Sequence, residues 1–159
     1  MTPTTRAFLL GLPYFAACSP EPVRVEVNFP TAAAFVNSEQ GRLRIFPLTR
    51  DELGLCPELL EGLPATNFPV PVLYDSDLRN RCEFRAGIHV PEFGGGPHAY
   101  VLEMRSSTND VILTGCTVGE VYSGAGEIRV ELHPTAGYAP LLTMPVPGTP
   151  ESVCGGATP

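Results

Sequence analysis

The chain has 159 residues, with ten arginines, no lysine, 17 acids and a formal net charge of −7. Its length fits one domain, and a hydrophobic content of 43% is typical of a folded chain. The negative charge excludes nucleic acid and anionic lipid surfaces as main partners, because both bind clustered positive charge. No stretch reaches the roughly 20 apolar residues of a membrane-spanning helix.

The N-terminus has the layout of an export signal. Residues 1–20 contain no acid, and Arg6 precedes an apolar run over 7–17, as in a secretory signal peptide. Phe15-Ala16-Ala17-Cys18 resembles the lipobox of bacterial lipoproteins. The resemblance implies a signal peptide over 1–17, lipid attachment at Cys18, a tether over 18–22 and, with Ser19 next, an outer-membrane location. Plain secretion, with Cys18 an ordinary cysteine, is the alternative.

Four further cysteines are candidates for disulfide bonds: Cys56, Cys82, Cys116 and Cys154. An even number in an exported chain predicts two bonds. No CxxC occurs, so neither a zinc site nor a thioredoxin-like redox site is expected. Three pairings are possible. We favour Cys56–Cys116, because Cys116 ends an apolar strand and Cys56 lies in a segment that must be tied to a sheet.

Short strands and turns account for most of the remaining chain. Alternation of apolar and polar residues, together with turn signals, predicts strands over 23–29, 41–46, 72–74, 82–90, 100–105, 111–116 and 127–132. The five-residue loop 106–110 predicts a hairpin. One helical segment is expected over 31–36, with Thr31 as its cap. A second is expected after Pro57 and should end at Gly62, with Asp51 as a candidate cap in the stretch before it.

About seven short strands and one or two short helices predict an all-β fold, namely an antiparallel β-sandwich over 23–133. A small barrel would give the same signals. Arg42 and Arg44 should point away from the core. Ten of the 26 residues in 134–159 are Pro or Gly, which predicts an extended tail pinned back through Cys154. The expected core residues are Val25, Val27, Leu43, Ile45, Val101, Ile112, Ile128 and Val130.

Three segments carry a resemblance to a known kind of domain. They are Val90-Pro91 with Gly96-Pro97-His98-Ala99-Tyr100, Ile112–Cys116 and Ile128–Leu132. They are similar to transthyretin-like, or carboxypeptidase regulatory-like, domains over about residues 23–133. With the lipobox and the lysine-free composition, the chain also resembles envelope lipoproteins of the myxobacterial type. The resemblance implies a fold and a surface location, and it carries no catalytic residues.

Residues with catalytic or metal-binding chemistry are sparse. His89, His98 and His133 are expected at surface strand ends. The turn 75–77 lacks the glycine and the distal glutamate of a known calcium loop. Cys116, His133 and Met144 are too widely spaced for a blue-copper loop, and no GxSxG motif occurs. We therefore expect no enzyme, no metal and no cofactor.

The remaining candidates are aromatic residues that could contact a ligand: Tyr74, Phe93, Tyr100 and Tyr122. The sequence as a whole predicts a lipid-anchored, non-enzymatic module of the cell envelope, with a structural or protein-interaction role. Its partners would be the membrane, through the anchor, and another envelope protein or glycan, but no nucleic acid. The alternative is a carbohydrate- or Ca²⁺-binding module of the cell surface.

Overall fold

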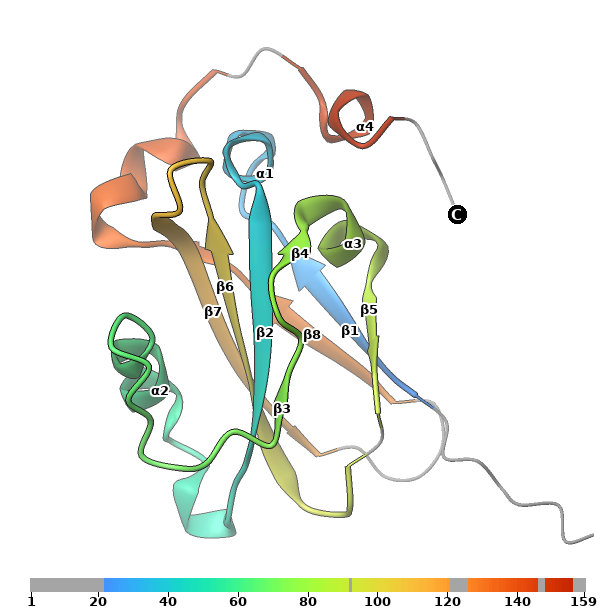
Figure 1. Cartoon of the computed structure of the whole chain (residues 1–159), viewed down its shortest axis with the longest axis vertical. Helices are drawn as coiled ribbons and strands as arrows, with labels where there is room; N and C mark the ends of the chain where they lie inside the picture. Colours follow the sequence, from blue (N-terminus) through green and yellow to red (C-terminus); the bar gives the residue numbers. More distant parts are fainter. Residues whose placement is uncertain (1–21, 92, 121–125, 146–147, 156–159) are drawn as a thin grey trace, which may run out of the picture.

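The computed structural model describes residues 22–91, 93–120, 126–145 and 148–155. The expected signal peptide, Cys18 and Tyr122 lie outside these residues. Within them, two sheets and a few short helices form a mostly β structure (Figure 1), so the all-β prediction is confirmed. None of the described helices is long and apolar enough to cross a membrane.

The smaller sheet has the strand order β5–β1–β8. It consists of β1 (Val23–Asn28), β5 (Ile88–Val90) and β8 (Glu127–Glu131). β1 runs antiparallel to β5 but parallel to β8, with Val25 opposite Ile128. The prediction of a wholly antiparallel fold is therefore wrong. β1 and β8 come from distant parts of the chain, so no hairpin turn fixes their relative direction.

The larger sheet is antiparallel throughout, with the order β3–β2–β6–β7–β9 and β4 paired to β2. The hairpin of β6 and β7 is confirmed, although both strands are longer than expected. The strands are β2 (Gln40–Pro47), β3 (Tyr74–Asp75), β4 (Arg79–Asn80), β6 (Pro97–Arg105), β7 (Val111–Glu120) and β9 (His133–Pro134).

Two of the helices were predicted. α1 (Ala32–Asn37) begins after Thr31, whose hydroxyl accepts a hydrogen bond from the Ala34 N–H at 3.0 Å. α2 (Cys56–Gly62) ends at the expected glycine. The preceding 3₁₀ helix η1 (Arg50–Glu52) is capped by Thr49, not by Asp51, because Glu52 reaches back to the Thr49 N–H.

Two segments differ from the prediction. Residues 82–86 are not a strand: they belong to α3 (Arg81–Ala86), which a capping box of Asn80 and Glu83 initiates. The tail is not simply extended either, because it forms a 3₁₀ helix, η2 (Ala136–Leu142), and a short helix, α4 (Pro150–Val153). Leu141 is 5% exposed and packs into the main core, which explains why this proline-rich segment is ordered.

The main core takes side chains from both sheets, including Val25 and Ile128 from one and Leu43 and Tyr100 from the other. Glycines of β7 allow β8 to approach closely, because a Cβ on Gly115 would lie only 2.4 Å from the carbonyl oxygen of Glu131. Seven of the expected core residues contribute to this core, although Val27 is only partly buried.

A second apolar cluster lies on the other face of the larger sheet, beneath α2 (Figure 1). It joins Leu59 of α2 and Leu63, the residue that follows this helix, to Phe46 and Val101 of the sheet. Val101 was expected in the main core but faces this cluster, because β6 is buried on both faces and alternate residues point to opposite sides.

Two disulfide bonds brace the described residues. Cys56–Cys116 ties α2 to β7, which is the pairing we favoured, and Cys82–Cys154 ties α3 to the residue that follows α4. The prediction that Cys154 pins the tail to the body is confirmed.

Candidate functional site

The structure places the predicted aromatic residues in different environments. Tyr100 is 1% exposed in the main core, so it is not available to a ligand, and its burial raises the pKa of its hydroxyl. Tyr74 and Phe93 are partly buried against the same core, with ring centroids 5.9 Å apart. The next ring in this row is His98, 5.9 Å from Phe93. These aromatics therefore close one end of the core and do not form an open stacking platform.

The histidines lie apart from one another in the strands. His89 and His133 are exposed, as predicted, whereas His98 is 6% exposed and therefore not a surface residue. Burial lowers the pKa of His98 below its usual value, and a hydrogen bond to the Gly96 backbone offsets this in part. Among the described residues, no group of three or more His, Cys, Asp or Glu side chains is placed to hold a metal ion.

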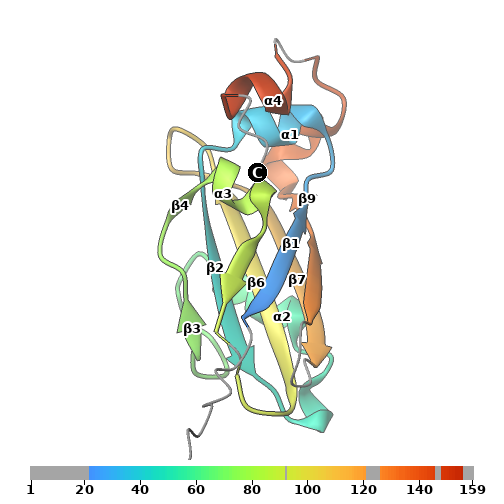
Figure 2. The same cartoon turned by 90° about the vertical axis from the view of Figure 1, so that its right-hand side faces the viewer.

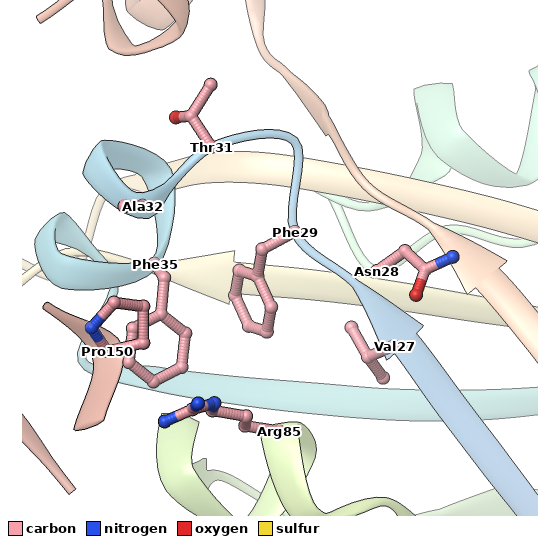
Figure 3. Close-up of a pocket in the computed structure, with 8 residues that line it drawn as sticks. All are labelled: Val27, Asn28, Phe29, Thr31, Ala32, Phe35, Arg85 and Pro150. Carbon is pink, nitrogen blue, oxygen red and sulfur yellow. The ribbon is translucent and has the colours of Figure 1, made fainter.

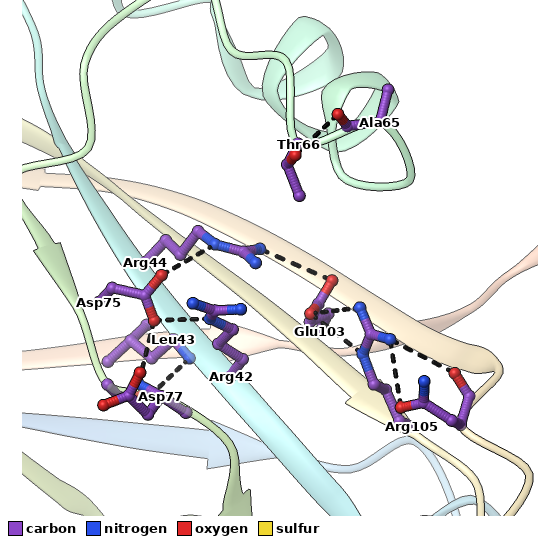
Figure 4. Close-up of polar contacts among 11 residues, drawn as sticks. Arg42, Leu43, Arg44, Ala65, Thr66, Asp75, Asp77, Glu103 and Arg105 are labelled. Carbon is purple, nitrogen blue, oxygen red and sulfur yellow. Dashed lines mark hydrogen bonds and ion pairs between the residues drawn. The ribbon is translucent and has the colours of Figure 1, made fainter.

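The Asp75–Asp77 turn belongs to a row of charges on the larger sheet (Figure 4). The Asp75 carboxylate accepts hydrogen bonds from Nε of Arg42 at 2.6 Å and from Nε of Arg44 at 3.3 Å. Burial alone would raise the pKa of Asp75, but the Arg42 guanidinium and the Asp77 N–H lower it overall. Two arginines thus occupy the carboxylate that a calcium site would need.

The row continues into the second apolar cluster. Arg44 and Glu103 have 3% and 0% of their side chains exposed, and Nη1 of Arg44 lies 3.6 Å from Oε2 of Glu103. Arg105 contacts the other Glu103 oxygen at 2.9 Å, and the Phe68 ring covers the Arg44 guanidinium at 5.4 Å. Arg44 does point away from the main core, as expected, but it is buried. We assign to this row of charged side chains a structural role, which is to hold the 64–73 segment on the sheet.

A different region of the described structure is hollowed. At the end of β1, an open pocket of about 320 Å³ lies between α1, α3 and α4 (Figure 3). The rings of Phe29 and Phe35 meet edge to face, 4.9 Å apart, and Pro150 of α4 and Arg85 of α3 lie beside Phe35. The pocket is lined by Val27, Asn28, Phe29, Thr31, Ala32, Phe35, Arg85 and Pro150.

A smaller, polar pocket of about 160 Å³ adjoins it and shares Val27, Asn28 and Arg85. It adds the charged side chains Arg24 and Glu26. Gly87 has a φ of +89°, and a Cβ there would lie 3.0 Å from Nε of Arg24, so glycine leaves room for this arginine. We call the two pockets together the β1 groove, which has an apolar end at Phe35 and a charged end at Arg24.

Two arginines of α3 support the apolar end of the β1 groove. The guanidinium carbons of Arg81 and Arg85 lie 5.8 and 5.7 Å from the centre of the Phe35 ring, a distance at which cations interact with aromatic faces. Arg81 also donates hydrogen bonds to the carbonyls of Val36 and Ser38 at the end of α1. Arg85 pairs with Glu151 of α4. The side chain of Arg85 is 37% exposed, so it remains accessible to a ligand.

Little in the sequence indicated the β1 groove. Its residues come from four segments between Arg24 and Pro150, and no short motif joins them. The Asn80 and Glu83 capping pair could have revealed α3, and with it the placement of Arg81 and Arg85 on one helix. Comparison of the chain with protein-family models, curated proteins and solved structures finds no match.

Proposed function

We propose that the protein is a non-enzymatic, lipid-anchored β-sandwich of the cell envelope, which binds a partner polypeptide in the β1 groove. The sandwich arrangement is supported by the core that residues of both sheets share. Export is supported by the two disulfide bonds, which persist mainly in oxidising compartments. Cys18 is the proposed anchor.

The observation that carries the proposal is the place of the groove relative to the start of β1. The proposed tether, residues 18–22, has five residues, so it spans at most about 18 Å. From Val23, β1 runs toward the end of the molecule where α1, α3 and α4 gather (Figures 1 and 2). A chain anchored at Cys18 would therefore present the apolar end of the β1 groove, at Phe35, on the side away from the membrane.

The lining of the β1 groove suggests the chemistry of the partner. Its apolar end offers Phe29 and Phe35, and two arginines, Arg24 and Arg85, lie along its charged part. α4 already places a proline against this wall and a glutamate on Arg85. The complementary partner is a peptide segment with an apolar residue next to an acidic one.

Selection from a library of random peptides displayed on phage tests this proposal. Peptides enriched on the wild type should pair an acidic with an apolar residue and should lose binding to R85Q. The matched control is R50Q, which removes an exposed arginine of η1, outside the groove. Peptides that bind R85Q as well as the wild type would contradict the proposal, as would no enrichment on either the wild type or C82S/C154S, which lacks the bond at the end of α4.

A further inference from the structure

α4 lies against the β1 groove but takes little part in either core. None of its residues is buried, and the described residues after Leu141 are all exposed or half-buried. In the described part of the chain, its backbone hydrogen bonds stay within 149–154. Packing therefore does not hold α4 in place.

Three contacts connect α4 to the body. Pro150 lines the pocket beside Phe35, and Glu151 pairs with Arg85. The Glu151 side chain is 64% exposed, and ion pairs this exposed contribute little. The third contact is the covalent Cys82–Cys154 bond, which joins the end of α4 to the first turn of α3. A four-residue helix is not stable alone, so α4 depends on this bond.

We infer that the Cys82–Cys154 disulfide is a latch that holds α4 across the β1 groove, and that its reduction releases α4 and frees Arg85 and Phe35 for a partner. The inference rests on the proposed function of the groove for its biological meaning. While the latch is closed, Glu151 occupies Arg85 as the acidic residue of a partner would.

Opening is a thiol–disulfide exchange with a dithiol reductant. A thiolate of the reductant attacks one sulfur of the bond and forms a mixed disulfide, and the displaced sulfur takes up a proton. The second thiol of the reductant then releases the other cysteine. Cys82 and Cys154 end as thiols, and the reductant ends as a disulfide, so two electrons and two protons are transferred.

The second disulfide provides a matched control. Cys56–Cys116 ties down α2, but Leu59 and Leu63 bury α2 in the second cluster independently of the bond. Loss of this bond should lower the global stability and leave α2 on the sheet. Loss of the Cys82–Cys154 bond should in addition release α4, because its residues are not buried in either core.

Hydrogen exchange of the full chain tests the latch, with C82S/C154S compared with the wild type and with C56S/C116S. Both variants lose a disulfide that closes a long loop, so both should lose some protection throughout the chain. We expect residues 148–155 to exchange at least about tenfold faster in C82S/C154S than in the wild type or in C56S/C116S. Equal protection of 148–155 in C82S/C154S and the wild type would overturn the inference. So would equal acceleration there in C56S/C116S.

Access to the groove is measured with 1-anilinonaphthalene-8-sulfonate, a probe that combines an apolar ring with an anion. Its affinity for C82S/C154S should exceed that for the wild type by about tenfold, and the R85Q substitution in this background should remove most of the gain. An unchanged affinity would overturn the inference. Neither readout uses a partner peptide. Failure of the library selection on C82S/C154S as well as on the wild type would therefore count against the proposed function alone.

Discussion

The buried pair of Arg44 and Glu103 offers a quantitative test of what holds the 64–73 segment on the sheet. With 3.6 Å between Nη1 and Oε2, Coulomb's law at an effective dielectric constant of about 20 gives roughly 5 kcal/mol of attraction. Removal of Arg44 leaves Glu103 buried with Arg105 still beside one of its oxygens, so the cost should be near the lower end of the about 3–5 kcal/mol expected for a broken buried pair. We therefore expect R44M to lower the free energy of unfolding by this amount.

A double variant separates the charge from the packing. R44M/E103L leaves no buried carboxylate, so it should be more stable than R44M by about 2 kcal/mol. The control R129M breaks exposed ion pairs on β8 and should change stability by less than about 1 kcal/mol. Urea unfolding at pH 7, followed by far-UV circular dichroism with both disulfides intact, measures all three. A loss under about 1 kcal/mol in R44M, or a double variant less stable than R44M, would refute the reasoning.

Three further predictions concern packing, pH and the first disulfide. G115A should lower the free energy of unfolding by at least about 2 kcal/mol, because its Cβ would collide with the Glu131 carbonyl oxygen. An unchanged free energy of unfolding, measured with urea, would contradict this prediction and would mean that the two sheets can separate. Burial lowers the pKa of His98, so below about pH 6.5 the unfolded chain binds more protons than the folded chain. The free energy of unfolding should therefore fall as the pH is lowered from about 6.5, and H98Q should remove this fall from the curve of stability against pH. C56S/C116S opens a loop of 60 residues and should lower the free energy of unfolding by about 4 kcal/mol, whereas an unchanged urea midpoint would contradict the chain-entropy argument.

The sequence predicted elements that local signals define. Alternation located β1, β2 and β8 to within two residues, and Thr31 marked the start of α1. Alternation does not say whether a strand is buried on one face or on both. This is why Val101 and Arg44 were expected in the wrong surroundings.

Other features depend on contacts between distant parts of the chain. The parallel pairing of β1 with β8 joins residues about a hundred positions apart, and no turn signal reports it. The order in the tail comes from Leu141 in the core and from the bond between Cys82 and Cys154. The β1 groove depends on both of these tail contacts, because it is complete only when α1, α3 and α4 have come together.

The intact mass of the protein isolated from its native membrane, with and without reduction, tests the central claim of an anchored, disulfide-braced module. The chain of an anchored, disulfide-braced module should begin at Cys18, carry added acyl mass and gain four hydrogen atoms when its two disulfides are reduced. Retention of residues 1–17, absence of acyl mass, or free thiols at all four of Cys56, Cys82, Cys116 and Cys154 before reduction would contradict it.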